Sequence, residues 1–238
     1  KLLRIPVEVD LASELRYRDP VVNEKTLLIV ISQSGETADT IAAMKECKKR
    51  GAYVLSIVNV VGSTIAKLSD DVLYTRAGPE IAVATTKGYT TQLAVLYLFA
   101  VYAAKVLGKI ADEEYKKYIS ELCGLPKIMQ AAIDGNKNIP ELAKKYHRHR
   151  SLFFIGRNVD YAVAMEGSLK LKEISYLHSE AYAAGELKHG TISLIDDGHL
   201  VIALACYEPL FEKTMSNIKE VKSRGAHVFM LCKQGMHV

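Results

Sequence analysis

The chain has 238 residues, of which 49% are hydrophobic, so it can bury a sizeable core as one large domain or two smaller ones. The formal net charge of +4, with both signs mixed along the chain, suits small anionic ligands and argues against a nucleic-acid-binding protein. The four cysteines are scattered without a CxxC pair, so we expect no disulfide framework or zinc site, and a cytoplasmic location.

Short apolar runs predict seven strands, at residues 5–9, 27–32, 53–58, 72–75, 152–155, 200–205 and 227–232. Helical patterns lie between them, at residues 37–50, 85–107, 112–133, 140–147, 160–177 and 209–224. The strands are rich in Val, Ile and Leu without polar alternation, which is typical of strands buried on both faces of a parallel sheet. The alternation of helices and strands predicts an α/β fold with right-handed crossovers.

The longest uncharged apolar run, residues 93–104, is too short to span a bilayer and indicates a buried helix, so no membrane partner is expected. No signal peptide is recognisable. The chain begins without methionine beside one strand-like run and stops just after another, so we expect a fragment of a longer protein.

Two helix ends share one pattern, in which basic residues of the last turn precede Gly51 or Gly225 and a strand follows. The repeated pattern suggests a duplication, with a first domain at residues 1–133, a linking segment with a helix at residues 134–150, and a second domain at residues 151–238. We interpret the basic end of the linking segment as a solvated helix terminus, because a nucleic-acid patch would need a longer basic stripe.

The stretch "SQSGET" follows the second predicted strand and leads into a helix. Ligands of open α/β sheets sit beyond the carboxyl ends of strands, and a helix N-terminus there binds phosphate well. The residues that offer neutral donors are Ser32, Gln33, Ser34 and Thr37. The stretch is neither a P-loop nor a dinucleotide fingerprint. It predicts a phosphate-monoester site, and ordinary helix capping by Ser or Thr is the alternative.

A second candidate lies on the helix predicted at residues 160–177, where Glu166, Lys170 and Glu173 fall on one face. A half-buried group of this kind suits acid–base chemistry, and an exposed salt-bridged face is the alternative. His189 can move protons near neutral pH, although a single histidine is often structural. In "GPEIAVATTK", Thr85 follows a strand end and begins a helix, where it could bind a ligand or simply cap.

Three stretches, "SQSGETADT", "AGPEIAVATTKGYTTQ" and "LKLKEISYLHSEAYAAGELKHG", resemble the sugar-isomerase half of the glutamine–fructose-6-phosphate aminotransferase (isomerising) family, the glucosamine-6-phosphate synthases. The similarity runs along essentially the whole chain. The first stretch alone indicates only a sugar-isomerase (SIS) domain, whereas the third is specific to this enzyme family and its close relatives. The resemblance implies two similar nested SIS-type domains, each a parallel sheet flanked by helices in three layers.

Enzymes of this family make glucosamine 6-phosphate from fructose 6-phosphate and glutamine. Matched onto this sequence, the resemblance implies that the phosphate is held by Ser32, Gln33, Ser34 and Thr37. It implies that the sugar is contacted by the backbone of Val83 and by Thr85.

The resemblance also implies catalytic roles. Glu173 would be the base that moves a proton between C1 and C2, Lys170 would assist near the open-chain carbonyl, and Glu166 would orient the site. His189 would help to open the sugar ring and would reach the site of a neighbouring subunit, so a homodimer is expected. No metal or other cofactor is implied.

The chain lacks three parts that the family has: an N-terminal glutaminase domain, the Cys-Gly-Thr-Ser turn that opens the first SIS domain, and a C-terminal tail with an active-site lysine. We therefore expect a fragment that cannot use glutamine and is not catalytically competent by itself. Two alternatives stay open. One is a relative that deaminates or deglycates sugar phosphates, and the other is a non-catalytic sugar-phosphate-sensing module that would not need the Glu173, Lys170 and His189 set.

Overall fold

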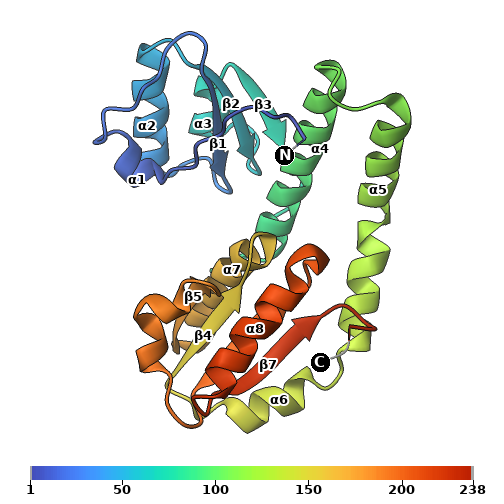
Figure 1. Cartoon of the computed structure of the whole chain (residues 1–238). Helices are drawn as coiled ribbons and strands as arrows, with labels where there is room; N and C mark the ends of the chain where they lie inside the picture. The colour runs from blue at the N-terminus through green and yellow to red at the C-terminus, as the bar shows by residue number, and fades with distance from the viewer. Residues whose placement is uncertain (1, 237–238) are drawn as a thin grey trace. The chain divides into compact units, whose positions relative to one another are not determined.

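The computed structural model describes residues 2–236. The chain divides into two compact units, Lys1–Ile133 and Asp134–Val238 (Figure 1). Each unit contains an all-parallel sheet with helices packed on it, which confirms the predicted α/β class. No helix within residues 2–236 combines the length and the apolar character needed to cross a membrane.

The first unit holds a three-stranded parallel sheet in the order β1-β2-β3. The strands are β1 (Leu27–Ser32), β2 (Tyr53–Val58) and β3 (Asp71–Tyr74), and the helices are α1 (Ala12–Leu15), α2 (Ala38–Lys49), α3 (Thr64–Leu68), α4 (Lys87–Val106) and α5 (Asp112–Gly135). Met44 of α2 and Ile65 of α3 share a buried cluster with Val30, Val54 and Val58, so these two helices pack on the sheet through apolar contacts.

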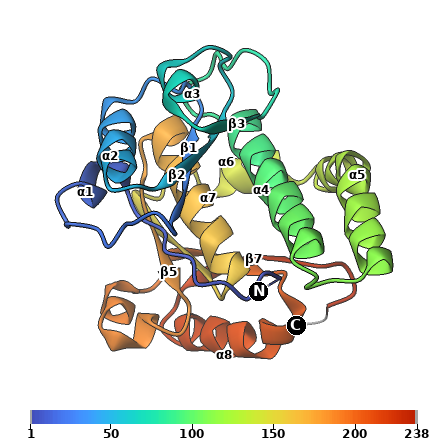
Figure 2. The ribbon, with the colours of Figure 1, turned by 90° about the horizontal axis from the view of Figure 1, so that it is seen from above.

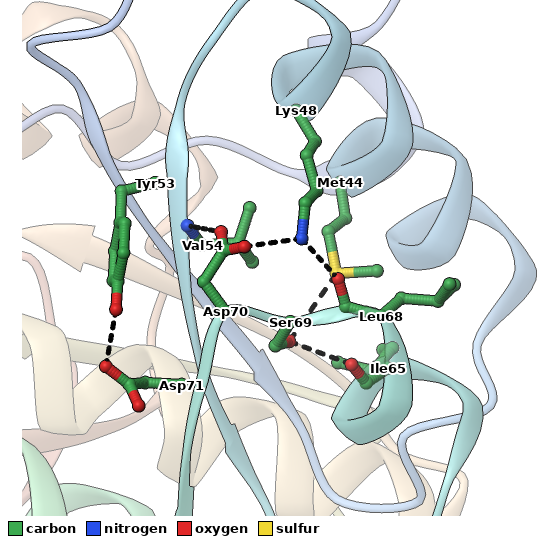
Figure 3. A network of polar contacts seen from close by, with 9 residues as sticks. All are labelled: Met44, Lys48, Tyr53, Val54, Ile65, Leu68, Ser69, Asp70 and Asp71. Atoms are coloured by element: carbon green, nitrogen blue, oxygen red, sulfur yellow. Dashed lines mark hydrogen bonds and ion pairs between the residues drawn. The ribbon is translucent and has the colours of Figure 1, made fainter.

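A polar network at the edge of this unit ties α2 to the strands (Figure 3). Lys48 donates a hydrogen bond to Asp70 at 2.6 Å, and the backbone N–H of Val54 donates to the other oxygen of Asp70 at 2.8 Å. The Lys48 ammonium and the Val54 amide hold the pKa of Asp70 below its ordinary value. The hydroxyl of Tyr53 donates to Asp71 at 2.6 Å, and this carboxylate raises the pKa of Tyr53.

The second unit holds a four-stranded parallel sheet in the order β5-β4-β6-β7. Its elements are α6 (Ile139–Tyr146), β4 (Ser151–Gly156), α7 (Val159–Ser175), β5 (His178–Ala183), the short 3₁₀ helices η1 (Leu187–His189), η2 (Thr191–Leu194) and η3 (Glu208–Leu210), β6 (Leu200–Ala205), α8 (Phe211–Lys222) and β7 (His227–Cys232). Phe154 packs with Ala164 of α7, whereas Phe153 and Ile155 pack with Met215 of α8. Since side chains alternate along a strand, α7 and α8 cover opposite faces of the sheet (Figure 2).

Several sequence predictions need correction. Residues 5–9 were predicted as a strand, but they form none, and Val9 is 94% exposed, because no neighbouring strand pairs with them or buries their side chains. Strand β5 was missed, because its sequence "HSEAYA" mixes polar residues with alanine. Helix α7 ends at Ser175 rather than at residue 177, since Tyr176 adopts a left-handed conformation with φ of 59°.

Candidate functional site

The turn between β1 and α2 carries the predicted phosphate-binding residues, and it is fastened to the start of α3. The carbonyl of Gly35 accepts a hydrogen bond from the amide of Ile65 at 3.0 Å. The carboxylate of Glu36 accepts one from the amide of Thr64 at 2.7 Å, and this bond lowers the pKa of Glu36. The turn is therefore held in place at the carboxyl edge of the sheet, where ligands of α/β folds bind.

The hydroxyl groups of this turn keep their hydrogens available. The oxygens of Ser32 and Ser34 accept bonds from the amides of Gly35 at 3.0 Å and Glu36 at 3.2 Å, so each hydroxyl can still donate outward. Thr37 occupies the N-cap position of α2, but its side chain makes no capping hydrogen bond. The first amides of a helix have no partner within the helix, so this turn offers several neutral donors to an anion.

Residues 78–88, which follow β3, approach this turn at Gly88. The hydroxyl of Thr85 donates to the carboxylate of Glu80 at 2.5 Å, and this bond lowers the pKa of Glu80. A Cβ atom added to Gly88 would lie 2.6 Å from the hydroxyl oxygen of Thr85 and 3.4 Å from Cγ of Gln33. Two segments that are about fifty residues apart in sequence therefore converge at Gly88. Helix α4 begins at Lys87 rather than at Thr85.

Val83 lies in the same segment and is 94% exposed. Its carbonyl accepts a hydrogen bond from the amide of Thr85 at 3.0 Å, which leaves the second lone pair of that carbonyl open to a ligand. The structure thus places both predicted sugar-contacting residues in one segment of the first unit.

An open pocket of about 570 Å³ lies at this edge of the sheet. Its polar and turn residues are Gln33, Asn59, Arg76, Gly78, Pro79 and Glu80. Sequence reasoning selected only Gln33 of this set. Glu80 lies within the stretch "GPEIAVATTK", so the sequence could have indicated it. Asn59 and Arg76 lie in the turns after β2 and β3, and only the order of the strands brings them to this pocket.

In the second unit, Glu166, Lys170 and Glu173 lie together on one face of α7, as the sequence predicted. The Lys170 ammonium lies 3.7 Å from a Glu166 oxygen and forms a shorter ion pair and hydrogen bond with Glu173. The three side chains are only 17%, 21% and 28% exposed, in the order Lys170, Glu166, Glu173. This arrangement differs from a fully exposed salt-bridged face, because water is largely excluded from the central cation.

Close packing fixes the position of α7 on its sheet. A Cβ atom added to Gly167 would lie 3.0 Å from the ring of Phe154, so the helix approaches β4 closely at that point. The buried hydroxyl of Ser179 on β5 donates to the carbonyl of Ser168 at 2.8 Å. These contacts hold the charged face of α7 in a defined place.

His189 lies at the end of η1 and is exposed. The segment before it is anchored, since Leu187 is 1% exposed in the core and Gly185 lies against the guanidinium of Arg157. Arg157 in turn donates two hydrogen bonds to Asn217, at 3.0 and 2.9 Å. Within residues 2–236, no hydrogen bond or ion pair joins His189 to the charged face of α7, so the structure does not bring this fourth predicted residue into direct contact with the other three.

Within the described part of the chain, no group of three or more His, Cys, Asp or Glu side chains is placed to hold a metal ion. The two sets of residues offer hydroxyl, amide, carboxylate, ammonium and imidazole groups.

Comparison with known proteins gives the family context. A family model of the SIS domain matches residues 1–102 and 145–237. The chain is 60% identical over 232 residues to a glutamine–fructose-6-phosphate aminotransferase (isomerizing) of Caldanaerobacter subterraneus subsp. tengcongensis, which covers 98% of this chain and 38% of that relative. It is 56% identical over 235 residues to the enzyme of the same name from Clostridium tetani, which covers 99% of this chain and 39% of that relative.

Among solved structures, the chain is similar to the C-terminal domain of glucosamine-fructose-6-phosphate aminotransferase from Francisella tularensis. The TM-score is 0.95 at 39% sequence identity, and the match covers 98% of this chain and 66% of that one. The chain thus spans less than half the length of the curated relatives that it matches, at 38% and 39%.

Proposed function

The chain belongs to the SIS domain family, and from this membership we propose that it carries the sugar-isomerase step of a glutamine–fructose-6-phosphate aminotransferase. In this proposal it binds fructose 6-phosphate and converts it, with ammonia, to glucosamine 6-phosphate. The observation that carries the proposal is the ion-paired group on α7, in which Lys170 lies between Glu166 and Glu173. A sugar-phosphate sensor would need the phosphate turn but no such group.

The phosphate is assigned to the turn after β1. The hydroxyls of Ser32, Ser34 and Thr37 and the amide of Gln33 donate to its oxygens, together with the N-terminus of α2. Neutral donors suit a substrate that must be released after each turnover. Thr85 and the backbone of Val83 contact the sugar hydroxyls.

The reaction is a proton transfer between neighbouring carbons. Ammonia condenses with the C2 ketone to form an imine and releases water. The Glu173 carboxylate removes a proton from C1, which gives an enolamine, and then returns a proton to C2 while C1 becomes the aldehyde. The Lys170 ammonium stabilises the negative charge that develops at C1 and its oxygen, which becomes the aldehyde oxygen, and Glu166 keeps the ammonium in place.

His189 is assigned to ring opening, by moving a proton to the ring oxygen. Its exposed position, without a bond to the charged face of α7, supports the idea that it serves the site of a neighbouring subunit in a homodimer. The ammonia comes from a glutaminase domain fused to the isomerase half. Four cysteines without a disulfide among residues 2–236 suit the reducing cytoplasm, where we place the enzyme.

Binding of fructose 6-phosphate by isothermal titration calorimetry tests the phosphate assignment. The Ser34→Ala/Thr37→Ala double variant loses two donors, so its affinity should fall by about tenfold or more. Ser223→Ala removes an exposed hydroxyl at the end of α8 and should bind as the wild type does. Equal affinity of the double variant and the wild type would contradict the assignment.

A further inference from the structure

The turn after β3 is held by one side chain, that of Asn59 at the end of β2. The Asn59 side-chain oxygen accepts hydrogen bonds from the hydroxyl of Thr75 at 3.0 Å and from the amide of Ala77 at 2.9 Å. Its side-chain amide donates to the carbonyl of Gly78 at 2.7 Å. The backbone amide of Asn59 donates to the carbonyl of Gln33 at 3.1 Å. Asn59 therefore joins the turn after β3 to the phosphate turn after β1.

Arg76 is the residue that this turn presents, and its backbone is strained. Its φ is +55°, a left-handed conformation that non-glycine residues adopt only at a cost in free energy. Strained positions of this kind persist when the surrounding structure enforces them, and they are concentrated at functional sites. Here the three hydrogen bonds of the Asn59 side chain hold the turn in this conformation.

The guanidinium of Arg76 is exposed and has unused donors. Within residues 2–236, it forms no hydrogen bond and no ion pair, and it lies over the ring of Tyr74, whose centroid is 5.6 Å away. Arg50 gives the contrast, because its guanidinium pairs with Asp19 at 2.7 Å. The hydrogen-bond donors of Arg76 stay open to a ligand.

Arg76 lines the same pocket as Gln33 of the phosphate turn, and among the described lining residues it is the one cation. The other charged lining residue is Glu80. Its carboxylate accepts bonds from the hydroxyl of Thr85 at 2.5 Å and the amide of Gly88 at 3.4 Å. The Glu80 charge is thus satisfied by its own segment, whereas the Arg76 charge is not.

We propose that Arg76 is a binding residue for the phosphate group of the ligand held at the turn after β1, and that Asn59 is the residue that positions it. The guanidinium complements the neutral donors of Ser32, Ser34 and Thr37 with one charge-assisted contact to a phosphate oxygen. This inference rests on the proposed function, because it takes the ligand to be a hexose phosphate.

Arg76→Gly gives the sharpest test, since glycine adopts φ of +55° without strain. The variant should unfold at the same temperature as the wild type or at a higher one, yet bind fructose 6-phosphate about tenfold more weakly in calorimetry. The affinity difference should shrink as salt is added, because it is electrostatic. Arg76→Lys should recover part of the affinity. As a control, Lys25→Gln removes one charge just before the opposite end of β1 and should leave the affinity for fructose 6-phosphate and the unfolding temperature unchanged.

The role of Asn59 is tested by combining variants. Asn59→Ala should weaken binding in the wild-type background but add little to Arg76→Gly, because residues that act through one another are not additive. If wild type binds and Arg76→Gly binds equally well, or if Arg76→Gly melts lower, the inference is wrong while the proposed function stands. If the wild-type chain binds neither fructose 6-phosphate nor inorganic phosphate, both are overturned.

Discussion

Gly35 of the phosphate turn lies directly against Ser63 at the start of α3. A Cβ atom on Gly35 would lie 2.1 Å from the Ser63 hydroxyl oxygen and 2.6 Å from its Cβ, and the φ of Gly35 is +68°. Gly35→Ala should therefore lower the free energy of unfolding by about 2–4 kcal/mol, from backbone strain and overpacking together. Chemical denaturation measures this loss, and fructose 6-phosphate binding should weaken with it.

Gly62 offers a matched control for that variant. Its φ is +74°, but an added Cβ would meet no atom within 4 Å. Gly62→Ala should therefore carry only the strain cost, about 1 kcal/mol. If the two variants are equally destabilised, the close approach of Gly35 to Ser63 does not contribute to the loss of unfolding free energy.

Asn158 should be replaceable with a gain in stability. It follows Arg157 after β4 with φ of 55° and ψ of −122°, a conformation that favours glycine. Asn158→Gly should raise the free energy of unfolding by about 1 kcal/mol, whereas Asn158→Ala should lower it, because alanine resists this conformation. A change in the same direction for both variants would contradict the strain that the backbone indicates.

The ion pair between Lys48 and Asp70 should make stability depend on pH. The folded-state pKa of Asp70 lies below its ordinary value of 3.8, mainly because of Lys48 and then Val54. Stability from this carboxylate is therefore complete above the unfolded-state pKa and is lost as pH falls through the lower folded-state pKa. The difference in unfolding free energy between wild type and Asp70→Asn should be constant above about pH 5 and should shrink below it.

Urea denaturation across the acid range measures this difference. Lys48→Met should remove most of the pH dependence, and Lys49→Met, a change at the next lysine along α2, should leave it in place. A difference that stays constant down to pH 2 would show that the ionised form of Asp70 contributes nothing to the free energy of unfolding.

Mixed dimers test the role of His189. The variants are made in this chain extended at both ends. If His189 serves the neighbouring subunit, the His189→Ala and Glu173→Gln chains should each be inactive, but a 1:1 mixture of the two should regain about a quarter of the wild-type rate, because a heterodimer holds one intact site. The rate is measured after the chains are unfolded and refolded together. A mixture as inactive as its parts would contradict a shared site.

Much of this fold follows from local patterns. The sequence reveals the apolar runs at β1, β2, β6 and β7 and the glycines after α2 and α8, because period, burial and capping agree there. Gly51 and Gly225 both have positive φ, at 96° and 88°, as glycines that end helices commonly do. By contrast, β5 becomes a strand through its pairing with β4. Its own sequence mixes polar residues with alanine and does not indicate a strand.

The candidate site, like the fold, has some residues that the sequence reveals and others that only the structure reveals. The hydroxyls of one turn and the helical spacing of Glu166, Lys170 and Glu173 are local, so the sequence could reveal them. Asn59 and Arg76 are brought to the phosphate turn by the order of three parallel strands, and no spacing in the sequence encodes that meeting.

The central claim is tested most directly by the rate at which fructose 6-phosphate and ammonium form glucosamine 6-phosphate. The assay uses this chain extended at both ends, with isomerisation to glucose 6-phosphate as a second readout. The extended wild type should be active, and Glu173→Gln should lower the rate by about a hundredfold or more with little change in substrate affinity. Glu212→Gln, at an exposed position on α8, should leave the rate unchanged. An inactive extended wild type, or a Glu173→Gln variant with the wild-type rate, would contradict the account.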